Sequence, residues 1–100
     1  MGMTAPIPFP QQVHFDRHEL GLILSLYGRM VAQGEWRDYG ISALRDLAIF
    51  AVFRRTAETP LYRIEKRPAL RGRQGMYAVV GMDGQTLRRG ADLAQVLRVL

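Results

Sequence analysis

The chain has 100 residues, a length typical of a single domain with one modest hydrophobic core. It contains no cysteine, which excludes disulfides, thiolate metal sites and thiol nucleophiles and fits a cytoplasmic protein. Basic residues number 14 and acidic residues 9, which gives a net charge of +5. The longest strictly apolar run, Leu47 to Phe53, is far too short to cross a membrane as a helix, which needs about 20 residues.

The positive charge is concentrated in one segment. Residues 54–89 hold nine basic residues against three acidic ones, a net charge of +6. Arginine dominates this charge, and its planar donor fork binds carboxylates and phosphates and stacks on aromatic rings. An arginine bias also results from a GC-rich genome, so it does not by itself identify a ligand.

The first twelve residues differ from the remainder. They hold three of the five prolines (Pro6, Pro8 and Pro10) and no charged residue, and they lack the basic start and apolar core of a secretory signal. We therefore predict a disordered leader over residues 1–12 and a single domain over residues 13–100.

The first element of the domain is an amphipathic helix over residues 17–33. Asp16 suits its N-cap, and Glu19 three residues later completes a capping-box pattern. Gly34 provides the left-handed residue with which many helices end.

Strand patterns follow the helix. Residues 37–44 form either a strand or a helical turn, and Arg45-Asp46 fits a turn. Residues 47–55 are apolar and indicate a central strand covered on both faces. Residues 61–67 alternate, which places Arg63 and Arg67 on one face and Lys66 on the other.

Two more strands and a second helix complete the chain. Residues 76–82 and 85–89 flank Asp83-Gly84, a strong hairpin signal. Asp92 can cap a final amphipathic helix that runs to the last residue. We predict an α+β fold, in which an antiparallel meander of four to five strands carries the N-terminal and C-terminal helices on one face. Its second face is then left for solvent, a partner or a ligand.

Four stretches carry a family resemblance: residues 35–39 (EWRDY), 53–55 (FRR), 60–68 (PLYRIEKRP) and 89–100 (RGADLAQVLRVL). Together they resemble a family of short, chiefly alphaproteobacterial proteins known as a domain of unknown function. The resemblance covers residues 13–100 and implies a bacterial cytosolic protein. It implies no activity, ligand or site residue.

The candidate binding surface combines basic side chains with aromatic ones. The basic residues are Arg54, Arg55, Arg63, Lys66, Arg67, Arg71, Arg73, Arg88 and Arg89, and the candidate aromatic anchors are Trp36, Tyr39 and Tyr62. Single-stranded nucleic acid is often bound by such a combination of positive charge and stacking rings. Equally, an arginine-bearing sheet face can be solvated and discourage aggregation, and Trp36 can close one end of the core.

The sequence gives no basis for a metal site, a cofactor or catalysis. His14 and His18 have the spacing of two ligands on a helix face, but Asp16 caps the helix between them. The glycines of residues 71–75 lack the lysine and hydroxyl residue that complete a phosphate-binding loop. We therefore predict no metal, no cofactor and no enzymatic activity.

The leading functional hypothesis is a small cytosolic binding or regulatory protein, adaptor-like, that uses the arginine-rich sheet face. Its expected partner is an acidic protein surface or a second copy of the chain. The alternative is sequence-tolerant binding of RNA or single-stranded DNA by the same face. No membrane partner is expected.

Overall fold

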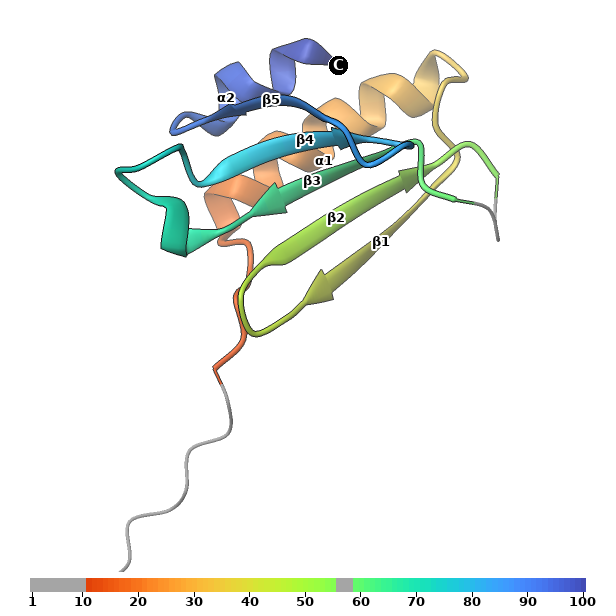
Figure 1. The fold of residues 1–100 in the computed structure, drawn as a ribbon. Helices are drawn as coiled ribbons and strands as arrows, with labels where there is room; N and C mark the ends of the chain where they lie inside the picture. Colours follow the sequence, from red (N-terminus) through yellow and green to blue (C-terminus); the bar gives the residue numbers. More distant parts are fainter. Residues whose placement is uncertain (1–10, 56–58) are drawn as a thin grey trace, which may run out of the picture.

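The computed structural model describes residues 11–55 and 59–100, and in these ranges five strands form one antiparallel sheet in the order β1-β2-β3-β4-β5. The elements are α1 (Arg17–Ala32), β1 (Asp38–Ala43), β2 (Ala48–Phe53), β3 (Tyr62–Lys66), β4 (Tyr77–Gly81), β5 (Thr86–Gly90) and α2 (Leu93–Val96), with 3₁₀ turns at Pro68–Leu70 and Leu97–Val99. Each strand pairs with the next one along the chain (Figure 1). The predicted α+β fold with an antiparallel meander is confirmed. Residues 1–10 of the predicted leader lie outside the described residues.

Helix α1 begins and ends where the sequence predicts, within one residue. The Asp16 carboxylate accepts from the Glu19 backbone N–H at 2.8 Å, and the Glu19 carboxylate accepts from the Asp16 N–H at 2.7 Å. This reciprocal pair satisfies two backbone donors at the start of the helix. At the other end Gly34 has a φ of 79°, a left-handed conformation that costs a residue with a Cβ about 1–2 kcal/mol.

A glycine inside α1 and the glycine just after it give opposite predictions for substitution by alanine. Gly28 lies inside α1 with no atom near an added Cβ, whereas Gly34 is left-handed. We expect Gly28→Ala to raise the free energy of unfolding by about 0.5–1 kcal/mol, because alanine has the higher helix propensity. We expect Gly34→Ala to lower it by about 1 kcal/mol, through backbone strain. Urea unfolding of both variants measures the two shifts, and a gain at Gly34 would contradict the assigned helix end.

The hairpin turns lie at the residues that the sequence predicts. Residues 37–44 contain a strand, β1, and not the alternative helical turn. The Leu44 N–H donates to the Leu47 carbonyl at 2.9 Å across Arg45-Asp46. In the β4–β5 hairpin, Gly84 has a φ of 87° and donates its N–H to the Gly81 carbonyl at 3.0 Å. Short connections of this kind favour a meander.

The hydrophobic core lies between the helices and one face of the sheet. Phe50, Ile64 and Val79 are neighbours across β2, β3 and β4 and are fully buried with Ile23 of α1. In Figure 1, α1 runs behind the sheet, and no helix crosses the near face. The prediction that residues 47–55 are covered on both faces is wrong, because β2 alternates between buried and half-buried residues. Its apolar second face has no covering layer among the described residues.

The C-terminal helix is shorter than predicted. Helix α2 has four residues and continues as the 3₁₀ turn Leu97–Val99. The Asp92 carboxylate caps it by accepting from the Gln95 N–H at 3.3 Å. Leu93, Val96 and Leu97 are buried in the core, so the predicted amphipathic face is present although the helix is brief.

Candidate binding surface

The second face of the sheet combines apolar and basic residues. Cross-strand pairing aligns Ala51, Arg63 and Val80 in one row and Ile49, Glu65 and Ala78 in the next, where Arg89 is the β5 neighbour of Ala78. Residues two apart on a strand share a face. We call the surface formed by Ile49, Ala51, Phe53, Arg63, Glu65, Arg67, Ala78, Val80 and Arg89 the open face.

At the centre of the open face, one carboxylate lies between two guanidinium groups. Glu65 accepts from Arg63 Nε and from Arg67 Nε, each at 3.4 Å. The Glu65 side chain is 7% exposed, whereas those of Arg63 and Arg67 are 36% and 39% exposed. The two arginines therefore share one acidic partner and keep much of their donor surface in contact with solvent.

The apolar part of the open face is partly covered by these long side chains. Val80 lies opposite Arg63 in the register and is 4% exposed, although no helix covers this side in the described ranges. Long arginine stems can cover apolar atoms while their charged ends reach water. Arg89 lies farther along the face and donates to the Gly75 carbonyl at 3.3 Å. Asp38 pairs with Phe53 and lies on the same side of the sheet, so Arg63, Arg67 and Arg89 against Glu65 and Asp38 give this side a net charge of +1.

The other candidate basic residues are not among the nine residues that define this face. Lys66 points to the helix side, where its ammonium group binds Glu19 at 2.8 Å. Arg54 pairs with Glu35 at 3.8 Å, and Arg71 approaches the Met76 sulfur at 3.6 Å. Arg88 pairs in register with the core residue Val79, on the helix side. Arg55 and Arg73 are exposed, at the end of β2 and in the loop before β4.

The three candidate aromatic anchors lie on the helix side as well. Trp36 is 2% exposed and Tyr62 packs partly buried against the core. The Tyr39 ring stacks on Phe50 with centroids 4.8 Å apart. These rings and the open-face guanidinium groups therefore lie on opposite sides of the sheet and do not form one surface, and the prediction that either set binds a partner stays a prediction. Neighbours in a strand point to opposite faces, so an adjacent pair such as Tyr62-Arg63 is separated by the sheet.

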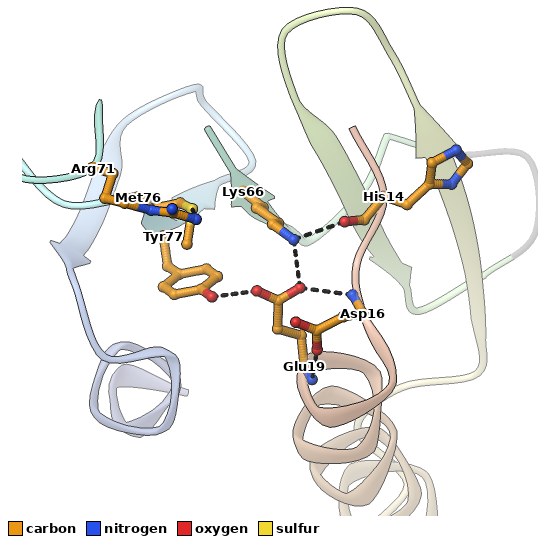
Figure 2. Close-up of polar contacts among 7 residues, drawn as sticks. All are labelled: His14, Asp16, Glu19, Lys66, Arg71, Met76 and Tyr77. Atoms are coloured by element: carbon orange, nitrogen blue, oxygen red, sulfur yellow. Dashed lines mark hydrogen bonds and ion pairs between the residues drawn. The ribbon is translucent and has the colours of Figure 1, made fainter. Parts of the chain in front are cut away.

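A buried polar cluster, not foreseen from the sequence, joins α1 to the sheet (Figure 2). Lys66 Nζ donates to Glu19 Oε1 and to the His14 carbonyl, both at 2.8 Å. The Tyr77 hydroxyl donates to Glu19 Oε2. The capping-box pattern identified Glu19, but nothing in the sequence shows that β3 and β4 supply its other partners.

The cluster changes the acidity of two of its members. Burial would raise the pKa of Glu19, but hydrogen bonds from Lys66, Tyr77 and the Asp16 backbone outweigh it and lower that pKa below its ordinary value. Burial, followed by the hydrogen bond to Glu19, raises the pKa of Tyr77. Every buried side-chain nitrogen and oxygen in residues 11–55 and 59–100 has a hydrogen-bond partner. The cluster therefore has a structural role, which is to hold the start of α1 on β3 and β4.

The histidines do not contribute to a cluster of metal ligands. His14 and His18 are both exposed, and the His14 ring points away from Glu19 in Figure 2. Across the described part of the chain, no three histidine or carboxylate side chains gather as a metal site would require. None of the helices described is long and apolar enough to span a membrane.

Comparison with known proteins places the chain in a family without assigning a function. No curated protein matches the sequence, and no solved structure matches it. A family described as a protein of unknown function, DUF2794, matches residues 13–97. This range includes α1 and all five strands, and it agrees with the resemblance to an uncharacterised family found in the sequence. The chain therefore belongs to the DUF2794 family of proteins of unknown function.

Proposed function

We propose that this protein is a small binding or regulatory protein whose open face docks on an acidic surface of a partner protein. The observation that carries the proposal is the combination of half-buried Ile49, Ala51 and Phe53 with a net positive charge beside them. Apolar area surrounded by arginine is typical of protein interfaces.

Arg63 and Arg67 suit acidic groups for a further reason. Glu65 contacts both guanidinium groups through their Nε atoms, which leaves the terminal nitrogens of each fork available for a partner carboxylate. Arginine binds carboxylates through two parallel hydrogen bonds, and a side chain already oriented loses less entropy on binding. The open face thus offers two pre-positioned donors next to an apolar area.

Nucleic acid is the alternative partner, and the positions of the rings favour it less. Stacking platforms contribute much of the affinity for single strands. Trp36, Tyr39 and Tyr62 lie on the side of the sheet that the helices cover, which leaves Phe53 as the open-face ring among the described residues. A protein partner needs no such platform.

The same proposal includes a cytoplasmic location and a role in binding instead of catalysis. The lack of cysteine fits a reducing compartment. The buried polar cluster, which has the shortest ion pair described above, holds helix and sheet together. Its groups already hydrogen-bond to one another, which supports a role in stability.

A charge-matched pair of variants tests the open face. The triple variant Arg63→Gln/Glu65→Gln/Arg67→Gln removes the central charges and lowers the net charge by one, and Arg73→Gln lowers it equally in the loop before β4. We expect the triple variant to weaken binding to captured partners by at least about thirtyfold, since anchoring arginines contribute about 2 kcal/mol or more. Arg73→Gln should bind like the wild type.

The measurement is affinity capture from the source cell, with and without nuclease, followed by titration of each captured protein against the three forms. A protein that survives nuclease treatment and is lost with the triple variant supports the proposal. If the captured species vanish with nuclease, and labelled single-stranded RNA or DNA then binds with steep salt dependence, the partner is nucleic acid. Equal capture by all three forms would rule out the open face.

A further inference from the structure

The outer edge of β1 has main-chain groups that do not bond to the sheet. The Leu44 N–H bonds to Leu47, and bonding alternates along an antiparallel pair, so Ser42 and Gly40 also face β2. The N–H and C=O groups of Tyr39, Ile41 and Ala43 therefore point away from β2. Because β1 ends the sheet, no further strand of the described chain pairs with them. The Tyr39 N–H is the exception, since it donates to the Asp38 carboxylate at 2.8 Å.

The side chains along this edge are unusually apolar for an exposed strand. Ile41 is 50% exposed and Tyr39 is 41% exposed, both on the helix side of the sheet. Asp38 is the charged residue of β1. The opposite edge strand, β5, contains Arg88 and Arg89. Charged residues on an edge strand discourage pairing with other chains, so β5 is protected in a way that β1 is not.

The edge of β1 is complementary to itself. When two copies run antiparallel with Ile41 opposite Ile41, Tyr39 of each copy lies opposite Ala43 of the other. Ile41 then forms a complete hydrogen-bonded pair with its copy, and the Ala43 N–H of each chain faces the free Tyr39 carbonyl of the other. On each side of the axis the large Tyr39 ring lies opposite the small Ala43 methyl group. If the register is shifted by two residues in either direction, fewer of the outward-facing residues Tyr39, Ile41 and Ala43 lie opposite one another. The symmetric arrangement also closes on itself as a two-fold dimer.

We propose that two copies of this chain pair through the outer edges of β1, centred on Ile41. The two five-stranded sheets then join into one ten-stranded sheet. The two-fold axis is perpendicular to the sheet, so both open faces lie on the same side. This interface is separate from the open face, and neither proposal depends on the other.

Single cysteines test the register, because the chain has no cysteine of its own. In the proposed dimer, the two Ile41 Cα atoms are about 5.5 Å apart, within the range of about 4.4–6.8 Å that a disulfide spans. Oxidised Ile41→Cys should run mainly as a disulfide-linked dimer on a non-reducing gel. Leu87→Cys is the matched control, because Leu87 lies on the other edge strand and is 43% exposed. It should remain mainly monomeric.

Light scattering over a range of concentrations tests the unmodified protein. We expect a mass approaching twice the chain mass of 11.4 kDa. Ile41→Lys places two ammonium groups face to face at the axis and should weaken the dimer by at least about tenfold, whereas Leu87→Lys should not. Circular dichroism verifies that each variant is folded. A monomer at every concentration, equal cross-linking at both positions, or assembly into open-ended polymers would each overturn the proposal.

Discussion

Replacing Glu19 with alanine will lower the free energy of unfolding by about 3–5 kcal/mol, because it leaves the buried Lys66 ammonium without its counter-charge. The Lys66 side chain is 12% exposed and that of Glu19 is 5% exposed, so solvent replaces the lost contact only in part. The same change removes the acceptor of the Tyr77 hydroxyl and half of the capping box. Urea unfolding followed through the single tryptophan measures the loss.

Glu35→Ala is the matched control for this substitution. Glu35 is also paired with a basic residue, but the pair with Arg54 spans 3.8 Å and both side chains are more than half exposed. Exposed ion pairs contribute about 0–1 kcal/mol, so Glu35→Ala should change stability little. The double variant Glu19→Ala/Lys66→Ala should lose less than the two single variants together. Equal losses for Glu19→Ala and Glu35→Ala would contradict the structural role of the cluster.

The same carboxylate gives the protein a pH dependence with a definite sign. The pKa of Glu19 in the folded protein is lower than the ordinary value of 4.5. A carboxyl group of this kind stabilises the fold fully above its unfolded-state pKa, and the contribution is lost as pH falls through the folded-state value. Between pH 7 and pH 3 the wild type should therefore lose more stability than Glu19→Ala. Parallel pH profiles for the two proteins would contradict the lowered pKa.

Truncating Phe50 to alanine will destabilise the protein by about 3–5 kcal/mol, through lost burial and the cavity left behind. Phe50 is fully buried, and its ring contacts Tyr39 at 4.8 Å and Tyr27 at 6.1 Å between centroids. The substitution therefore also removes aromatic contacts that link β1 and α1. Urea unfolding measures the loss, with the buried Trp36 as the fluorescent probe.

Phe53→Ala provides the comparison on the same strand. Phe53 is half-buried on the open face, so its truncation should cost well under half of the Phe50 value. If Phe53→Ala destabilises the protein as much as Phe50→Ala, Phe53 is covered in solution. The proposal that the open face is available to a partner would then be wrong.

Local signals account for most of the fold that the sequence predicts. The Asp16/Glu19 pair and Gly34 bound α1 to within a residue, and Asp83-Gly84 marks the β4–β5 hairpin. These features depend on residues a few positions apart, where backbone sterics and capping decide the outcome. The C-terminal helix was overestimated because its apolar spacing does not distinguish four α-helical residues plus a 3₁₀ turn from a longer helix.

The candidate site was harder to predict from the sequence than the fold, because it depends on which face of the sheet each side chain occupies. The alternation of side chains along residues 61–67 already placed Lys66 on the opposite face from Arg63 and Arg67. The candidate binding surface nevertheless included all three, because its basic residues were grouped by their position in the sequence. The partner of Lys66 is Glu19, 47 positions earlier, and the partner of Tyr77 is the same residue, 58 positions earlier. Contacts over such separations leave no periodic signature.

Those long separations also bear on the order in which the chain folds. Each strand pairs with its neighbour, so the sheet can grow through small loops, whereas docking α1 through Glu19 closes loops of 47 and 58 positions. Closing a longer loop costs more chain entropy, and non-local contacts slow folding. We therefore expect the β2–β3–β4 hairpins to nucleate first and α1, although first in sequence, to dock late. Substitutions in the cluster should then mainly accelerate unfolding, and substitutions such as Phe50→Ala should also slow folding.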